Sequence, residues 1–165
     1  MELLHLIALI AALLSSGLMA GLFTGYSYSV MPGIAILDDR NWVAALQHIN
    51  RVIINGRFMS GFLGSIAFSL AAVVLGIFLD DRAALPWTIA GLVLNLVGFI
   101  GTIAKNVPLN DKLEAAGDVA ALADPTALRT EVEATWIKWN HVRGIANLLA
   151  LAALALALYT AGTAA

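Results

Sequence analysis

Four long apolar runs constrain the fold of this chain more than any other feature of its sequence. They cover roughly residues 3–31, 58–79, 85–103 and 137–159. Crossing the ~30 Å hydrocarbon core of a bilayer takes about 20 helical residues. In lipid, a helix satisfies its own backbone hydrogen bonds. The sequence therefore predicts an all-α protein, a four-helix transmembrane bundle.

The composition agrees with this prediction. Hydrophobic residues make up 61% of the chain and charged residues 12%, whereas soluble domains contain about 25% charged residues. The net charge of −2 argues against nucleic acid as a partner, and the lack of cysteine excludes disulfides and thiolate chemistry. We expect one membrane domain over residues 1–165, with the lipid bilayer as its surroundings.

Basic residues predict the orientation in the membrane. Segments 32–57 and 104–143 contain Arg40, Arg51, Arg57, Lys105, Lys112, Arg129, Lys138 and Arg143, whereas the opposite side has only Arg82. Lys and Arg accumulate in cytoplasmic loops. We therefore expect a cell (inner) membrane protein with loops 32–57 and 104–136 in the cytoplasm and both termini outside.

Two segments outside the apolar runs also read as helical. Residues 41–55, "NWVAALQHINRVIIN", alternate apolar and polar residues at helical spacing. They form either a short helix in the interface or a cytoplasmic extension of the second span. Between the third and fourth spans, a helix is expected to begin near Pro125 and to continue into the last span. Pro32 is expected to stop the first helix or its hydrogen-bonding pattern, and Pro108 is expected to break one helix and begin another.

The first run contains a ridge of small residues. Gly17, Gly21 and Gly25 are spaced four apart, which lets helix backbones approach closely. The ridge could pack within one bundle or between two copies, so a homo-oligomer is one possibility.

Polar side chains inside the spans need partners, and they are default candidates for a functional site. On the last helix they recur three or four residues apart and form one stripe. The stripe consists of Glu133, Trp136, Asn140, Arg143 and Asn147. Asn95, Thr102 and Asn106 share a face of the third helix by the same spacing.

These polar sets are expected to converge on one pocket at the cytoplasmic end of the bundle. Its predicted ligand-binding residues are Gln47, Asn50, Asn106, Asn110, Trp139, Tyr26 and Tyr28, with Asn140 and Arg143 as polar groups of the reaction site. A purely structural account is the alternative. In that account Lys138 and Arg143 reach the head groups, and Asn95 hydrogen-bonds Asn147 across two helices.

The histidines offer a base or, less specifically, metal ligands. His48 and His141 both fall on the cytoplasmic side, and either could remove a proton near neutral pH. No carboxylate in the spans accompanies them, so we assign no metal site. The sequence also lacks GxSxG, Walker and HExxH motifs.

Several motifs resemble those of the anthrone oxygenase-like family of small four-helix membrane proteins. They are "KNVPLN" (105–110), "WIKWNHVR" (136–143), "LQHINR" (46–51) and "SVMPG" (29–33). Asn50, Asn106, Asn110, Trp139, Asn140 and Arg143 match the family pattern. The resemblance implies oxidation of anthrones to anthraquinones by dioxygen, without a cofactor. Arg143 and the amides would then hold the enolate oxygen, and His141 or His48 would remove the proton.

Two functions are consistent with these observations. One is a cofactor-independent oxygenase or related redox enzyme that acts on a lipophilic aromatic, such as an anthrone or a quinol. The other is a non-enzymatic membrane module that binds a lipid, a quinone or a partner protein.

Overall fold

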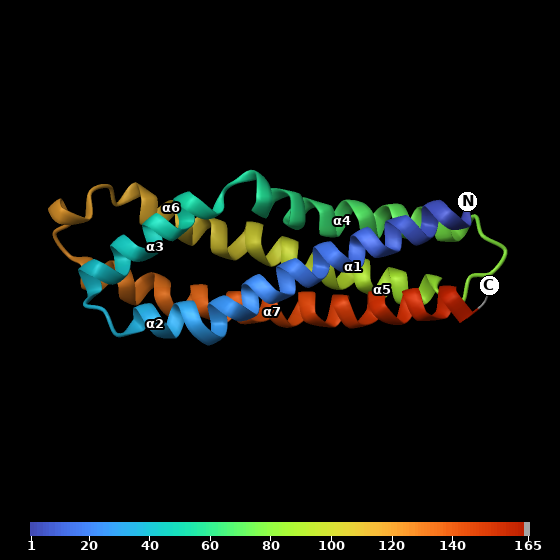
Figure 1. Cartoon of the computed structure of the whole chain (residues 1–165). Helices are drawn as coiled ribbons and strands as arrows, with labels where there is room; N and C mark the ends of the chain where they lie inside the picture. The colour runs from blue at the N-terminus through green and yellow to red at the C-terminus, as the bar shows by residue number, and fades with distance from the viewer. Residues whose placement is uncertain (164–165) are drawn as a thin grey trace.

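The computed structural model describes residues 1–163, and the described chain is built from helices along one long axis (Figure 1). The first half contains α1 (Glu2–Gly25), the π-helical turn η1 (Tyr26–Val30), α2 (Met31–Ala35), α3 (Asp39–Ile53) and α4 (Gly56–Ile77). The second half contains α5 (Leu85–Gly101), the π-helical turn η2 (Thr102–Asn106), α6 (Val107–Ala115), the 3₁₀ turn η3 (Val119–Ala121) and α7 (Pro125–Thr163).

Four continuous helical segments are long and apolar enough to cross a membrane. They are Glu2–Ala35, Gly56–Ile77, Leu85–Ala115 and Pro125–Thr163. This confirms the predicted helical bundle. The first, third and last segments extend beyond the predicted apolar runs, and α7 begins at Pro125 and continues through the last span, as expected.

The two internal prolines change the helices without ending them. Pro32 and Pro108 lie in the first turns of α2 and α6, where a missing backbone N–H is tolerated. Each follows a π-helical turn. The helical segments Glu2–Ala35 and Leu85–Ala115 therefore continue past residues 31 and 103, where the first and third apolar runs end.

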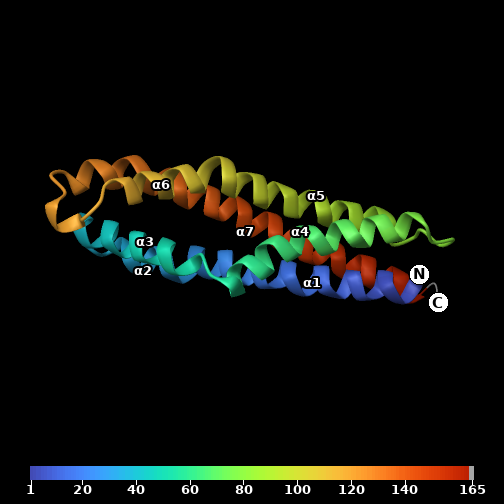
Figure 2. The ribbon, with the colours of Figure 1, turned by 90° about the horizontal axis from the view of Figure 1, so that it is seen from above.

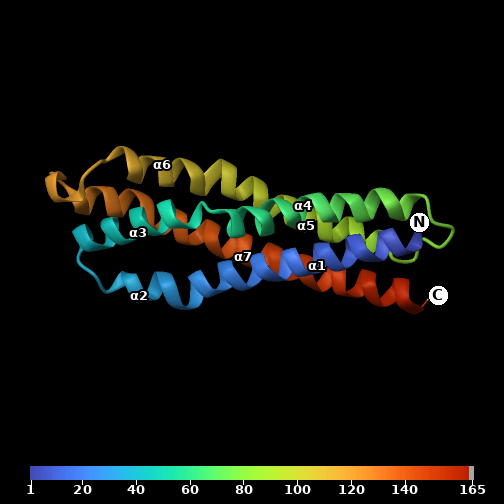
Figure 3. The ribbon, with the colours of Figure 1, turned by 45° about the horizontal axis from the view of Figure 1, so that its top comes forward.

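The amphipathic segment is an extension of the second span. Figures 2 and 3 show α3 along the long axis of the bundle, and the chain runs in the same direction through α3 and α4. A break at Ile54 and Asn55 separates the two helices. Asn55 then caps α4, because its Oδ1 accepts hydrogen bonds from the backbone N–H groups of Arg57 (3.0 Å) and Phe58 (3.1 Å).

Polar contacts fasten α3 to α6 and α7. Arg129 of α7 pairs with Asp39 at 3.1 Å and with Glu133 at 2.8 Å. Arg51 pairs with Glu114 of α6 at 2.8 Å. At the start of α3, backbone and side-chain hydrogen bonds from Asn41 hold the pKa of the Asp38 carboxyl below its ordinary value.

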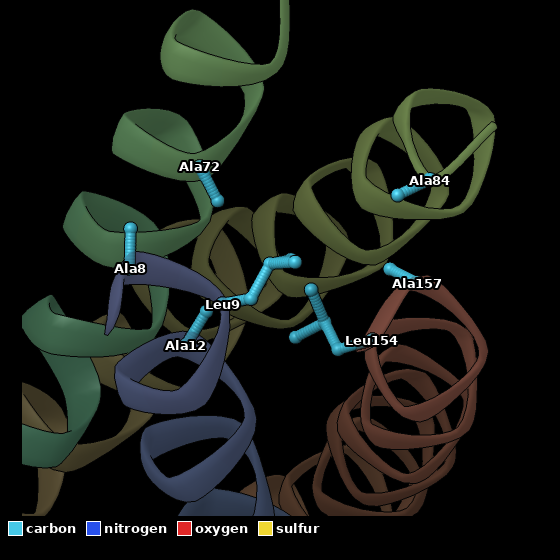
Figure 4. Close-up of a cluster of buried hydrophobic side chains, with 7 residues drawn as sticks. All are labelled: Ala8, Leu9, Ala12, Ala72, Ala84, Leu154 and Ala157. Carbon is cyan, nitrogen blue, oxygen red and sulfur yellow. The ribbon is translucent and has the colours of Figure 1, made fainter. Parts of the chain in front are cut away.

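The opposite end of the bundle holds the N-terminus, the end of α7 and the turn between α4 and α5 (Figure 1). Its core is made of small residues around two leucines. Figure 4 shows Leu9 of α1 and Leu154 of α7 among alanines of α1, α4, α7 and the turn before α5. Alanine allows these helices to approach closely.

The middle of the bundle is polar inside. Asn95 donates hydrogen bonds to the hydroxyls of Ser16 (2.8 Å) and Ser69 (3.1 Å), and all three residues are buried. Asn147 instead donates to the backbone carbonyl of Arg143 at 2.7 Å. The predicted hydrogen bond between Asn95 and Asn147 is therefore wrong. The amide N–H groups of Asn95 donate instead to serines of α1 and α4.

The three glycines of the α1 ridge differ in whether another helix packs against them. A Cβ at Gly17 would lie 3.4 Å from Leu151 of α7, so this glycine packs within the bundle. A Cβ at Gly21 or Gly25 would meet nothing within 4 Å.

Candidate functional site

A cavity of about 270 Å³ opens where α3 ends and α4 begins. Three sides come from the turn of α1 into η1, from η2 and α6, and from α7. The lining residues are Leu22, Phe23, Tyr26, Asn50, Ile53, Ile54, Phe58, Met59, Phe62, Thr102, Ile103, Val107, Asn110, Trp136 and Arg143. Ligand pockets are commonly about 300–1,000 Å³, mostly apolar, with a few polar groups. The volume of this cavity is just below that range, and its mostly apolar lining suits a small lipophilic molecule.

The two π-helical turns lie beside this cavity. Tyr26 begins η1 and Thr102 begins η2, and both residues line the cavity. The N–H of Met31 bonds to the carbonyl of Tyr26, five residues back, and Val107 bonds to Thr102 in the same way. In each case a proline lies six residues after the start of the turn. The wider turn accommodates a proline that lacks a backbone N–H, and such turns are frequent at functional sites.

Arg143 is the cation of the cavity. Only 7% of it is exposed, and its guanidinium lies 4.3 Å from the ring centre of Phe23 and 5.2 Å from that of Trp136. Among residues 1–163, no carboxylate forms an ion pair with it; the ion pairs there involve Arg51, Lys112 and Arg129. A buried guanidinium without a counter-ion costs desolvation energy, so it favours an anionic or electron-rich ligand.

Asn140 orients this guanidinium. Its Oδ1 accepts hydrogen bonds from Nε (3.2 Å) and Nη2 (2.9 Å) of Arg143. Its Nδ2 donates to the carbonyl of Phe23 (3.0 Å) and the hydroxyl of Ser27 (2.8 Å) on the first helical segment. Asn140 is fully buried, is absent from the lining, and ties α7 to the last turn of α1 and to η1. Nη1 of Arg143 has no hydrogen-bond acceptor among residues 1–163, so it is free for a ligand.

Asn50 supplies a second, neutral donor. It lines the cavity, and its buried Nδ2 has no hydrogen-bond partner in the described chain. A buried, unpaired amide N–H is costly unless a ligand or water accepts from it. The cavity therefore offers the charged donor of Arg143 and the neutral donor of Asn50 within a mostly apolar lining.

Trp136 and Asn110 form one wall together. The indole Nε1 of Trp136 donates to Oδ1 of Asn110 at 2.8 Å, which joins α7 to α6. The Trp136 and Tyr26 ring centres are 6.1 Å apart, with the planes tilted by 42°. An aromatic ligand could stack within this wall.

Three predicted site residues lie close by without lining the cavity. Asn106 is fully buried and donates to the backbone carbonyl of Trp136 at 3.2 Å, and its Oδ1 has no partner in the described chain. Gln47 donates to the carbonyl of Leu113 at 2.7 Å and so holds α3 against α6. Trp139 packs against Gly101, with the ammonium of Lys105 5.7 Å from its ring centre.

Three other predicted residues lie away from the cavity. His48, His141 and Tyr28 are exposed and are absent from its lining. Nδ1 of His141 lies 2.8 Å from the carbonyl of Ile137, on its own helix. One residue along a helix turns the side chain by about 100°, which takes His141 away from the face of Asn140. The structure therefore does not bring either proposed histidine base to the cavity.

Several lining residues were not singled out from the sequence. They include Phe23, Phe58, Met59 and Phe62. Phe58 and Phe62 are four apart in the first turns of α4, directly after the break at Ile54 and Asn55, and their ring centres are 5.2 Å apart in a stacked arrangement. Aromatic residues at helical spacing beside a helix break were the available signal, but the same pattern is typical of any core.

The predicted stripe on the last helix does face inward. Trp136, Asn140, Arg143 and Asn147 are buried, and Glu133 is half-buried. Within residues 1–163, no three His, Cys, Asp or Glu side chains lie together as metal ligands would. The polar chemistry of the cavity rests instead on a guanidinium, amides, a phenol and a threonine hydroxyl.

Comparison with known proteins identifies a family. The model of the family described as anthrone oxygenase matches residues 57–163, which include Arg143, Asn140 and the lining residues of η2 and α6. Tyr26 and Asn50 lie outside the matched segment. No curated protein and no solved structure matches the chain. Because the family model covers more than half of the sequence, the chain belongs to the anthrone oxygenase family.

Proposed function

We propose that this protein is a cofactor-independent oxygenase that oxidises a lipophilic aromatic, anthrone-like or quinol-like, in the cavity beside Arg143. The observation that carries the proposal is the buried guanidinium. Asn140 holds it through Nε and Nη2, and Arg143 lines a cavity with aromatic walls. The family supports the reaction class.

The chemistry suits such a cavity. An anthrone carries acidic C–H bonds opposite a ring carbonyl, and loss of one proton gives an enolate. Arg143 and the unpaired Nδ2 of Asn50 would hold the enolate oxygen. Donors fixed in a water-poor site stabilise developing negative charge far better than donors in water. Dioxygen is apolar and reaches such a site through the bilayer.

The overall reaction balances with dioxygen as the sole oxidant. The ring carbon loses two hydrogens and gains one oxygen atom, so anthrone plus O₂ gives anthraquinone plus water. The enolate supplies the electrons, and the carbon–oxygen bond forms at the carbon between the two outer rings.

Oxygen consumption tests this proposal. Purified, metal-stripped protein is mixed with 1,8-dihydroxyanthrone in air, and uptake is recorded above the spontaneous rate. We expect catalysed uptake that is lost in Arg143→Ala and Asn140→Ala. The matched control is Lys138→Ala, which removes an exposed cation from the same helix. Uptake no faster than the spontaneous rate would contradict the proposal.

A binding role is the second candidate. The described lining residues include no histidine and no carboxylate, and this favours a module that holds a quinone or lipid without reacting with it. Quenching of tryptophan fluorescence by the added aromatic, together with uptake at the spontaneous rate, would identify such a binder.

A further inference from the structure

The cavity contains one side chain that can exchange a proton. Its described lining includes two ionisable residues, Tyr26 and Arg143. A guanidinium stays protonated in proteins and acts only as a donor. His48 and His141 are exposed outside the cavity. A reaction that removes a proton from a bound ligand must therefore use the phenol of Tyr26 or a water molecule.

The position of Tyr26 fits such a step. It is the first residue of η1, and the wider turn places its ring 6.1 Å from Trp136. The guanidinium of Arg143 lies 5.2 Å from the ring centre of the same indole, and Tyr26 and Arg143 both line the cavity. The hydroxyl forms no hydrogen bond within residues 1–163, which leaves it free to meet a ligand. An adjacent cation stabilises a phenolate.

We propose that Tyr26 is a catalytic residue, the group that takes the proton from the ligand's acidic carbon and later returns it, with Arg143 stabilising the phenolate. This inference rests on the proposed oxygenase function. The phenolate removes one proton from the ring carbon, leaving the enolate and a neutral phenol. The enolate passes electrons to dioxygen, and a new C–O bond gives a peroxide anion that takes the proton back from Tyr26.

The second half of the cycle uses the same group. The phenolate removes the remaining hydrogen of that carbon as a proton, and the electrons of the C–H bond form the carbonyl. The O–O bond breaks, and hydroxide leaves. Hydroxide takes the proton from Tyr26 and departs as water, which regenerates the phenolate for the next proton transfer.

Tyr26→Phe tests the assignment, because it removes only the hydroxyl and keeps the ring against Trp136. Tyr28→Phe is the matched control, since Tyr28 lies two residues along the same turn and is 79% exposed. The first readout is oxygen uptake with 1,8-dihydroxyanthrone. The second is anaerobic exchange of the acidic C–H for deuterium, which requires proton transfer but no oxygen. Quenching of tryptophan fluorescence reports binding separately.

For Tyr26→Phe we expect both rates to fall roughly 100-fold or more, the usual scale of general acid–base catalysis. Ligand affinity should change less than about threefold, and Tyr28→Phe should behave as wild type. If exchange is catalysed and lost in Tyr26→Phe but uptake is never catalysed, the tyrosine assignment stands and the oxygenase proposal fails. If uptake is catalysed equally by wild type and Tyr26→Phe, or if wild type catalyses no exchange, the tyrosine assignment is overturned.

Discussion

Asn140 accepts two hydrogen bonds from Arg143, one turn further along α7, through a single oxygen: 3.2 Å from Nε and 2.9 Å from Nη2. The amide nitrogen of Asn140 donates hydrogen bonds to Phe23 and Ser27 of the first helical segment. Flipping the amide would thus break contacts on both sides. The pair fixes the direction of a buried cation without neutralising its charge, which leaves that charge for a ligand.

Asn140→Ala is expected to weaken ligand binding more than it weakens the fold. Hydrogen bonds to charged groups contribute about 1.5–3 kcal/mol, so affinity for the aromatic ligand should fall roughly 10- to 100-fold. Fluorescence titration measures the change. His141→Ala, one residue along and exposed, is the control and should bind as wild type. Equal losses in both variants would show that Asn140 has no specific role in orienting Arg143.

Arg143→Met should raise thermal stability while abolishing activity. The guanidinium is buried without an acidic partner in the described chain, and replacing such a charge by an apolar side chain of similar volume relieves desolvation. Each kcal/mol gained should raise Tm by about 2–4 °C in a chain of this size. Melting in detergent measures it.

Arg129→Met is the contrasting variant on the same helix. Arg129 pairs with Asp39 and Glu133 and lies 5.2 Å from the ring centre of Trp42. Its loss should lower Tm, because two carboxylates lose their partner. A lower Tm in Arg143→Met as well would mean that Arg143 serves the fold and not a ligand.

Gly91→Ala should destabilise the bundle. A Cβ at Gly91 would lie 2.7 Å from Cγ of Leu154 and 2.9 Å from its Cδ2, so α5 and α7 would have to separate. Overpacking of this kind costs about 1–3 kcal/mol. Gly21→Ala is the matched control, because nothing lies within 4 Å of the added carbon. Gly21→Ala should melt at or above the wild-type temperature, and a drop equal to that of Gly91→Ala would refute the packing argument.

The orientation in the membrane remains a prediction from basic residues, and single cysteines test it, since the chain has none. Ala123 is exposed between η3 and α7, and Ala83 is exposed in the turn between α4 and α5, at the opposite end of the bundle. An impermeant thiol reagent should label Ala83→Cys in intact cells and Ala123→Cys only after lysis. The reverse pattern would place the cavity near the outer face.

Much of the fold could be predicted because hydrophobic length and helical spacing are local properties. The four runs, the continuous helix from Pro125 and the inward stripe through Trp136, Asn140 and Arg143 each follow from a single segment read alone. Asn50 and Asn110 were also predicted for the pocket, and both line the cavity. The composition of residues 41–55 did not decide between an interfacial helix and an extension of α4. The helix would bury the same apolar face in either position.

The sequence by itself determined a bundle of membrane-length helices and the polar face of its last helix, since each depends on the period of the α-helix and the thickness of the bilayer. Only the tertiary structure decided which polar groups share the cavity. It brought Tyr26 and Arg143 to one indole and left His48 and His141 outside. The hydrogen bond between Asn140 and Phe23 joins residues 117 positions apart. Such a contact depends on how the helices pack and rotate about their axes, which no local sequence pattern encodes.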